Sequence, residues 1–161
     1  MILIGLGSNV PGRWGKPQQT IEKALEKLNE APCQVLVAST LIKTAPFGMV
    51  DQPDFVNAVA SISCSLTPKE LMAHLHDVEL LADRRRTVRW GPRTLDLDLL
   101  DYNGQVLEGE GETKGHQKPL KLPHPGIPQR LFVLEPIAEI APDWVHPILN
   151  KSVKSLIADL K

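Results

Sequence analysis

Apolar residues in the first half of the chain follow two periods, one typical of strands and one typical of helices. The opening stretch, residues 1–7, is apolar and predicts a buried strand that ends at the glycines of the motif GLGSN. Leucine, isoleucine and alanine at helical spacing predict a helix over 17–29. Alternating valines predict a strand over 33–41. A second alternating run predicts a strand over 55–65, after a loop broken by proline and glycine.

The next helix begins at Thr67. Threonine is a good N-cap, Pro68 suits the first turn, and Glu70 closes a capping box. The buried stripe of this helix is formed by Leu71, Leu75, Val78 and Ala82.

The remaining elements are shorter. The segment TLDLDLLDY, residues 94–102, predicts a strand, and Asn103-Gly104 predicts a tight turn that returns through QVLEG. The stretch 108–118 lacks an apolar anchor and is expected to be a mobile excursion. Short helices are predicted over 129–135 and 152–160.

The order strand, helix, strand, strand, helix, strand is typical of a split βαβ unit. We therefore expect an α+β fold with a ferredoxin-like core, a mainly antiparallel sheet flanked by helices, and C-terminal additions. At 161 residues the chain is long enough to bury a core as one domain, 1–161, without disulfides.

Composition narrows the classes of function. With 18 basic and 19 acidic side chains the net charge is −1, which argues against a general nucleic-acid binder. Cys33 and Cys64 lack the spacing of metal ligands and are expected to be free thiols in or near the core. The apolar stretches are too short for a membrane span, so we expect a cytoplasmic protein.

The candidate chemistry lies in RWGPRTLDLDLL, residues 89–100. Asp96 and Asp98 share one face of the predicted strand, and the leucines share the other. Two carboxylates rooted roughly 6–7 Å apart suit Mg²⁺, which prefers oxygen ligands and substrate phosphates. Five arginines just upstream favour a polyphosphate site, because guanidinium groups pair bidentately with phosphate. They are Arg84, Arg85, Arg86, Arg89 and Arg93. The alternatives are a solvated strand face or a structural salt-bridge network.

Other motifs are incomplete. Gly7 and Gly12 have P-loop spacing, but Arg13-Trp14 stands where Lys-Ser/Thr is required. The histidines lack the spacing of a zinc site, and the sequence has no GxSxG elbow.

Residues 89–100 resemble, almost letter for letter, the signature of the 6-hydroxymethyl-7,8-dihydropterin pyrophosphokinases of folate biosynthesis. The motifs GLGSN, TAPFG, DQPDFVNAV, LPHP and RLFVLEPIAEIAP occur in that family's order. The resemblance implies transfer of pyrophosphate from ATP to the hydroxymethyl group of the pterin, with release of AMP. It also implies two Mg²⁺ ions held by Asp96 and Asp98. The expected partners are ATP and the pterin, with no nucleic acid and no membrane, and a monomer is expected.

The resemblance also implies the remaining site residues. Arg84 and Arg93 would grip the phosphates during transfer and form the catalytic set together with the two aspartates. The implied ATP-binding set is His76, Glu79, Arg84, Arg86, Trp90, Arg93, Leu99, His124 and Arg130. The implied pterin-binding set is Thr44, Phe47, Phe55, Asn57 and Phe132, with the rings of Phe55 and Phe132 enclosing the pterin. In isolation these two phenylalanines would be read as core residues.

Three positions depart from the family pattern. Phe55 stands where tyrosine is frequent, His76 stands where some members have glutamine, and Lys121 replaces a threonine seen in some members. Lys121 is a candidate for an added phosphate or ribose contact.

Three other functions share parts of this pattern. A nucleotidyltransferase also pairs aspartates on a strand, but its Gly-Ser turn lies close upstream, whereas Gly7-Ser8 is almost ninety residues away. An Asp-x-Asp glycosyltransferase would need a sugar-nucleotide fold, for which the chain is short. A ferredoxin-like module that binds nucleotide without turnover would be expected to have lost Asp96 or the arginines, which are present.

Overall fold

A computed structural model of the chain describes residues 1–45, 51–82, 92–110 and 120–161. The elements in chain order are β1 (Ile2–Ser8), α1 (Pro17–Leu28), β2 (Cys33–Ala38), β3 (Ile42–Thr44), β4 (Phe55–Cys64), α2 (Pro68–Leu81), β5 (Asp96–Tyr102), β6 (Leu107–Glu110), β7 (Leu120–Leu122), the 3₁₀ helix η1 (Ile127–Gln129), α3 (Leu131–Ile140) and α4 (Val153–Leu160).

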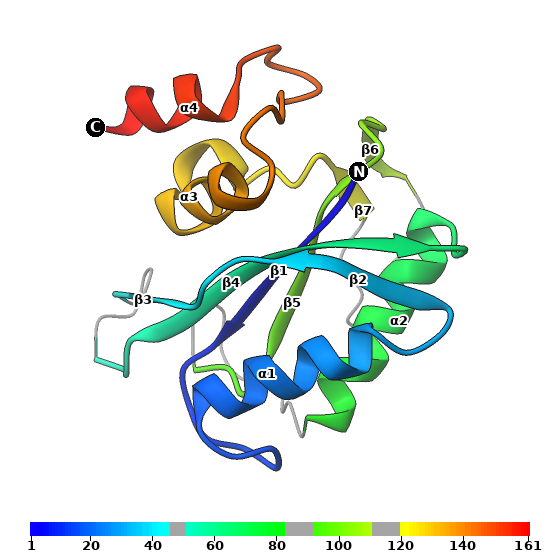
Figure 1. Ribbon diagram of the computed structural model, residues 1–161, viewed down its shortest axis with the longest axis vertical. Coiled ribbons are helices and arrows are strands. Elements are labelled where there is room, and N and C mark those ends of the chain that lie inside the picture. The colour runs from blue at the N-terminus through cyan, green and yellow to red at the C-terminus, as the bar shows by residue number, and fades with distance from the viewer. Residues whose placement is uncertain (46–50, 83–91, 111–119) are drawn as a thin grey trace.

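The main sheet has the order β2-β4-β1-β5, and β3 also pairs with β4 (Figure 1). All of its pairings are antiparallel. The connection through α1 joins β1 to β2 across β4, and the connection through α2 joins β4 to β5 across β1. These two interlaced crossovers form the split βαβ arrangement, so the predicted α+β class with a ferredoxin-like core is confirmed.

Helices lie on both faces of this sheet (Figure 1). On one face, α1 and α2 pack against alternate residues of the strands, such as Ile4, Ile62 and Leu97. On the other face, α3 and α4 pack against the intervening residues Leu3 and Leu100. Because successive strand residues point to opposite faces, β1, β4 and β5 contribute to both cores. Fully burying one such leucine stabilises the fold by about 1.5–3 kcal/mol.

The N-terminal strand, α1, α2 and α4 were predicted close to their observed bounds. The capping box of α2 is present, with Thr67 accepting from the Glu70 amide and Glu70 accepting from the Thr67 amide. The predicted stripe of Leu71, Leu75, Val78 and Ala82 is buried. One detail differs, because β1 continues through both glycines to Ser8 instead of ending at them.

The predicted continuous strand over 33–41 is wrong, because β2 ends at Ala38 and β3 starts at Ile42. Between them the Ser39 amide still donates to the Val59 carbonyl at 2.8 Å, and side chains supply the other hydrogen bonds. Ser39 accepts from the Val59 amide at 2.9 Å, and Thr40 donates its amide and hydroxyl to Glu139 of α3 at 3.1 Å.

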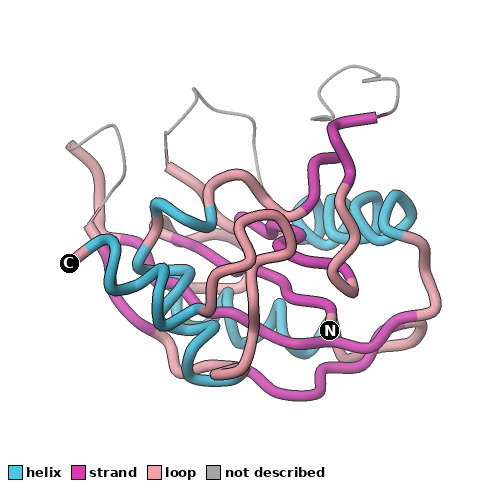
Figure 2. The backbone as a smooth tube through the Cα atoms, turned by 90° about the horizontal axis from the view of Figure 1, so that it is seen from above, coloured by secondary structure: helices cyan, strands magenta, loops and turns pink. Residues whose placement is uncertain are grey.

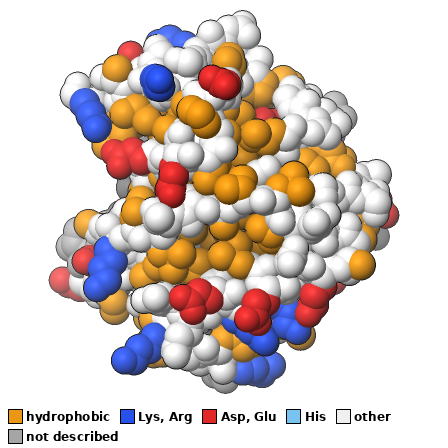
Figure 3. All heavy atoms as spheres, in the orientation of Figure 1, with side chains coloured by type: hydrophobic (Ala, Val, Ile, Leu, Met, Phe, Trp, Pro, Cys, Tyr) orange, Lys and Arg blue, Asp and Glu red, His pale blue; other side chains and the backbone are white. Residues whose placement is uncertain are grey.

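A bulge between Val35 and Val37 also breaks the expected alternation of β2. Leu36 and Val37 are consequently 60% and 41% exposed at the sheet edge. Figure 3 shows the molecule from the same side as Figure 1, with apolar side chains across the middle and charged groups above and below them.

The region after β5 differs from expectation in its pairing. Asn103 and Gly104 have φ values of 52° and 74° and form the predicted turn. The returning segment, however, pairs as β6 with β7 and not with β5. Residues 108–110 of the expected excursion therefore belong to a hairpin, which stands apart from α3 and α4 (Figure 2). The rest of that stretch lies outside the described residues.

The helix predicted over 129–135 is also different, because α3 spans Leu131–Ile140 and includes Pro136. Proline usually marks a helix boundary, since it lacks an N–H and clashes with the preceding turn. Here the helix continues because Leu134 and Ile137, on either side of the proline, are both fully buried in the second core. Within the described ranges, the helices are too short or too polar to cross a bilayer.

Candidate active site

Part of the sheet face that carries α3 and α4 forms the floor of a cleft. On β1, Gly5 lies opposite Val59 and Asp98, and Gly7 lies opposite Asn57 and Asp96. These positions share one face of the sheet, and the two glycines leave the middle strand without side chains there. A Cβ atom at Gly7 would lie only 3.0 Å from Asn57 Oδ1. The glycines of the GLGSN motif therefore keep the floor open.

The cleft has a volume of about 630 Å³, within the range typical of small-molecule sites. Its walls come from β3, β4, β5, the β6–β7 hairpin and the start of α3. The sequence-predicted residues that line it are Thr44, Phe55, Asn57, Arg93, Asp96, Asp98, Leu99, His124, Arg130 and Phe132. Residues predicted separately for the metal, the nucleotide and the pterin are thus brought together in one space.

The acidic side of the cleft is formed by β5. Asp96 and Asp98 are half-buried on the cleft face, while Leu95, Leu97 and Leu99 are buried in the opposite core, as expected. The leucine row fixes the strand against the helices, so the carboxylates are presented by a rigid element. Leu99 is only 2% exposed, and its side chain packs in the core opposite the cleft.

His124 is oriented beside these carboxylates by two hydrogen bonds. Its amide donates to the Leu100 carbonyl at 2.8 Å, which fixes the LPHP segment on β5. Its Nδ1 accepts from the Gly126 amide at 3.0 Å. A neutral imidazole that accepts at Nδ1 carries its proton at Nε2, and Nε2 lies 3.9 Å from Asp98 Oδ1. His124 therefore presents a donor to the acidic side of the cleft.

Arg130 and Phe132 form a further part of the wall. The Arg130 guanidinium carbon lies 5.8 Å from the centre of the Phe132 ring, within the range of a cation–π contact. A Cβ atom at Gly126 would lie 2.8 Å from that same carbon, so Gly126 leaves the room in which the guanidinium sits.

Asn57 and Thr44 lie at the other end of the cleft, beside Phe55. Asn57 Nδ2 donates to Thr44 Oγ1 at 2.5 Å, across the β3–β4 pairing. Asn57 is only 8% exposed, and its amide is held in place by the hydroxyl. Two aromatic rings, an amide and a hydroxyl suit a flat ligand with a hydrogen-bonding edge.

His76 and Glu79 do not line this cleft. They lie on α2, where Glu79 is 5% exposed and its Oε2 accepts from the Leu97 amide at 2.8 Å. The other carboxylate oxygen lies 3.6 Å from Nδ1 of the half-exposed His76. Glu79 thus ties α2 to β5 at the residue between Asp96 and Asp98. Phe47, Arg84, Arg86 and Trp90 lie outside the described residues.

Several lining residues were not predicted from the sequence as part of the site. They include Gly5, Gly7, Met72, Glu108 and Gly126. Two glycines at alternate positions of an apolar strand are a sequence signal from which the floor of the cleft could have been predicted. Glu108 has no such signal, because it reaches the cleft only through the β6–β7 hairpin. Lys121, noted as a departure, lines the cleft and lies opposite Glu108 in that hairpin.

The donor set of the cleft fits a hard cation. Within the described ranges, groups of three or more His, Cys, Asp or Glu side chains that could together hold a metal are absent. Asp96 and Asp98 instead offer a pair of half-buried carboxylates. Mg²⁺ is commonly bound in this way, by one or two carboxylates together with waters and substrate phosphates.

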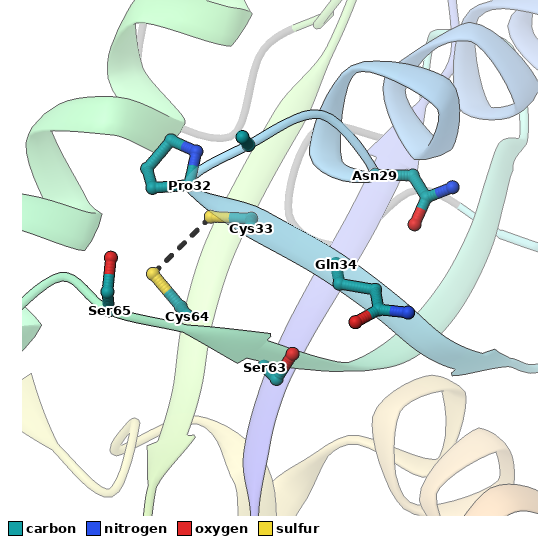
Figure 4. A pocket seen from close by; sticks show the side chains of 8 residues that line it. Asn29, Pro32, Cys33, Gln34, Ser63, Cys64 and Ser65 are labelled. Atoms are coloured by element: carbon teal, nitrogen blue, oxygen red, sulfur yellow. Dashed lines mark hydrogen bonds between the residues drawn. The ribbon is translucent and has the colours of Figure 1, made fainter.

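A second hollow lies at the far end of β2 and β4 (Figure 4). Its lining consists of Asn29, Ala31, Pro32, Cys33, Gln34, Ser63, Cys64 and Ser65. These residues include neither cations nor carboxylates, so they offer nothing that would hold a polyphosphate. Cys33 is buried and Cys64 half-buried, and both are free thiols, as predicted.

The chain is similar in sequence to a well-defined set of proteins. Residues 3–142 match the family model described as 7,8-dihydro-6-hydroxymethylpterin-pyrophosphokinase (HPPK). A 2-amino-4-hydroxy-6-hydroxymethyldihydropteridine pyrophosphokinase of Pseudomonas aeruginosa is 41% identical over 147 residues, which cover 91% of this chain and 83% of the relative. A protein of the same name from Aquifex aeolicus is 36% identical, covering 95% of this chain and 88% of the relative.

A solved structure agrees with this at the level of the fold. A crystal structure of a Plasmodium falciparum HPPK-DHPS triple mutant matches 98% of this chain and 42% of its own, with a TM-score of 0.73 and 13% identity. The family model and the curated relatives cover most of the sequence, and the chain belongs to the 7,8-dihydro-6-hydroxymethylpterin-pyrophosphokinase family.

Proposed function

We propose that the described cleft is where this chain transfers pyrophosphate from ATP to the hydroxymethyl group of 6-hydroxymethyl-7,8-dihydropterin, giving the pterin diphosphate and AMP for folate biosynthesis. The activity follows from the family. The observation that supports the location is the meeting, in one cleft, of a carboxylate pair on β5 with an aromatic and amide group on β4 and α3.

We propose that Asp96 and Asp98 hold Mg²⁺ with ATP, two ions as in the sequence-based expectation. Bound there, the metal would neutralise charge on the phosphates. The residues of this chain then have to place the reacting groups, because phosphoryl transfer depends mainly on positioning and electrostatics. Arg93, three residues before Asp96, supplies a cation at the same side of the cleft. Arg84 and Arg86 are proposed to assist, from the sequence resemblance alone.

The nucleotide is proposed to extend along the wall made by His124 and Arg130. The Nε2–H of His124 and the guanidinium of Arg130 are both donors, as an anionic ligand requires. Trp90, the Leu99 backbone and His76 remain further proposed contacts. For Glu79 we favour an anchoring role, because its carboxylate is buried against the Leu97 amide.

The pterin is proposed to lie between Phe55 and Phe132, with its polar edge toward Asn57 and Thr44. Asn57 Nδ2 donates one of its two N–H groups to Thr44, and its amide oxygen is proposed to accept from a ring N–H. Phe47 is proposed to add a backbone contact. We further propose that the protein is a monomer, that residues 1–161 form one catalytic domain, and that the enzyme works in the cytoplasm.

Phosphorus NMR on the protein with Mg²⁺, ATP and the pterin tests the reaction. AMP together with a new pterin diphosphate is the expected result. ADP would identify a simple kinase and free pyrophosphate a nucleotidyltransferase, and either would overturn the proposal. Turnover should disappear in Asp98→Ala, whose carboxylate faces the cleft rather than the core, with little change in melting temperature. A variant with near-normal turnover would exclude Asp98 as a metal ligand.

A further inference from the structure

Asn9, directly after β1, joins two segments that carry proposed site residues. Its Oδ1 accepts from the Arg93 amide at 2.8 Å, and its own amide donates to the Arg93 carbonyl at 3.0 Å. Its Nδ2 donates to Gln52 Oε1 at 2.8 Å and to the Pro53 carbonyl at 3.0 Å. Asn9 is only 2% exposed, so these bonds form away from bulk water.

One segment leads to the proposed phosphate-binding residues of the cleft and the other to its proposed pterin-binding residues. Arg93 lines the cleft itself and precedes Asp96 by three residues, and Pro53 precedes Phe55 by two. One side chain therefore sets the distance between the phosphate end and the pterin end. Only an amide fills this role, because it accepts on one side and donates twice on the other.

We infer that Asn9 is a positioning residue for pyrophosphoryl transfer: it holds the Arg93 backbone and the turn before Phe55 at the separation that the reaction needs. The inference rests on the proposed function. Asn9 need not touch either substrate, because a small displacement of a positioned group is enough to slow a reaction severely.

The test is steady-state kinetics on Asn9→Ala, with Asn29→Ala as the matched control. Asn29 Oδ1 accepts from the Val35 amide at 2.9 Å, so the control also removes an asparagine that fixes a loop, at the far end of the sheet. We expect Asn9→Ala to lower kcat by about tenfold or more, and Asn29→Ala to change it by less than about twofold. Equal effects of the two variants would overturn the inference.

A second comparison separates positioning from general destabilisation. If Asn9 acts through Arg93, the double variant Asn9→Ala/Arg93→Ala should be within about twofold of Arg93→Ala alone. Losses that multiply would show that Asn9 acts independently of Arg93 and would overturn the inference. Should Asn9→Ala fail to fold, Asn9→Asp enters the same comparison, since it keeps the acceptor for the Arg93 amide and loses the donor to Gln52 and Pro53. Wild-type protein that releases no AMP would instead refute the proposed function.

The thiol pair at the other end of the sheet carries an independent inference. Cys33 and Cys64 are directly opposite each other in the β2–β4 pairing, and their sulfurs lie 3.4 Å apart and face one another (Figure 4). Opposed residues of antiparallel strands have Cα atoms about 4.5–5.5 Å apart, which lies within the range that a disulfide bridges. We propose that these residues form a reversible oxidation site that hydrogen peroxide converts to a disulfide.

The order of oxidation follows from the two environments. Burial, together with the neighbouring Cys64, raises the pKa of the Cys33 thiol to about 12, and Cys64 is the more accessible thiol. Peroxide first oxidises Cys64 to the sulfenic acid and leaves as water. The Cys33 sulfur then displaces the hydroxyl group, which takes up the Cys33 proton and leaves as a second water. No large backbone movement is required.

Mass spectrometry of peroxide-treated protein tests this site. We expect a loss of two hydrogens, a peptide that links Cys33 to Cys64, and reversal by dithiothreitol. The melting temperature should rise by about 5 °C or more. The Cys64→Ser variant should show neither the linked peptide nor the rise in melting temperature. Added oxygen without a linked peptide, or a link between two chains, would overturn the proposal.

Discussion

Replacing Gly7 with alanine should separate ligand binding from folding. The added Cβ would lie 3.0 Å from Asn57 Oδ1 and 3.7 Å from the Phe55 ring, so the neighbouring side chain would have to move by a few tenths of an ångström. Asn57 is held by Thr44 and cannot retreat without losing that bond. The methyl group therefore occupies space at the pterin end of the cleft. We expect pterin affinity to fall by about tenfold or more, equivalent to about 1.4 kcal/mol.

Stability should change little in this variant. Alanine in a strand is favoured over glycine by about 0.5–1 kcal/mol, which offsets the crowding at Asn57. The net shift in melting temperature should then stay within about 3 °C. Gly5→Ala is the matched control, because its Cβ would meet the Leu100 side chain at an ordinary 3.5 Å.

Pterin titration followed by intrinsic fluorescence, with thermal melting of the same samples, measures both quantities. Unchanged pterin affinity in Gly7→Ala, at unchanged stability, would refute the placement of the pterin on this floor. A loss of affinity as large in Gly5→Ala would refute the argument from the Asn57 contact.

Three further predictions concern groups around the cleft. Glu79→Ala should lower the melting temperature by about 4–8 °C, because it leaves the buried Leu97 amide without its acceptor at a cost of about 2 kcal/mol. Glu79→Gln keeps an acceptor and should lower the melting temperature by less than half as much. Equal losses in the two variants would exclude the anchoring role. Burial lowers the pKa of His146 below its ordinary 6.5, against a smaller opposing effect of Asp101, and its Nδ1 accepts from the Ile148 and Leu149 amides. Its contribution to stability is therefore full above pH 6.5 and is lost as the pH falls below that value. The fall in melting temperature between pH 7.5 and pH 5.5 should consequently be smaller in His146→Gln than in the wild type. Trp144→Phe removes the 2.8 Å bond from Nε1 to the buried Asp101 carboxylate and should cost about 1.5–3 kcal/mol in denaturant titrations while leaving turnover near normal.

The sequence was sufficient for the core and for the acidic side of the site. Local periods identify strands and helices because burial imposes them, and the βαββαβ order restricts the topology. Asp96 and Asp98 could be assigned to one face because the leucines between and beside them had to face the core. That reasoning uses only neighbouring residues.

Features that depend on distant partners could not be read in this way. The break between β2 and β3 depends on Val59 and Glu139, which are 20 and 99 positions from the residues that they bond. Helix α3 continues through Pro136 because the second core demands it, and Glu79 turns to Leu97 because α2 lies under β5. In each case a tertiary contact overrides a local preference, and sequence periodicity holds no record of such contacts.

The covering of the sheet has a practical consequence. Helix α1 packs on the face opposite the cleft, with the sheet between them, and its Gln18, Glu22 and Glu26 side chains point to solvent. A fluorescent dye or a surface tether attached at Glu22 would therefore sit behind the strands, out of reach of either substrate. The same enzyme could be immobilised or labelled there for single-molecule and biosensor work while its cleft stays open to the solution.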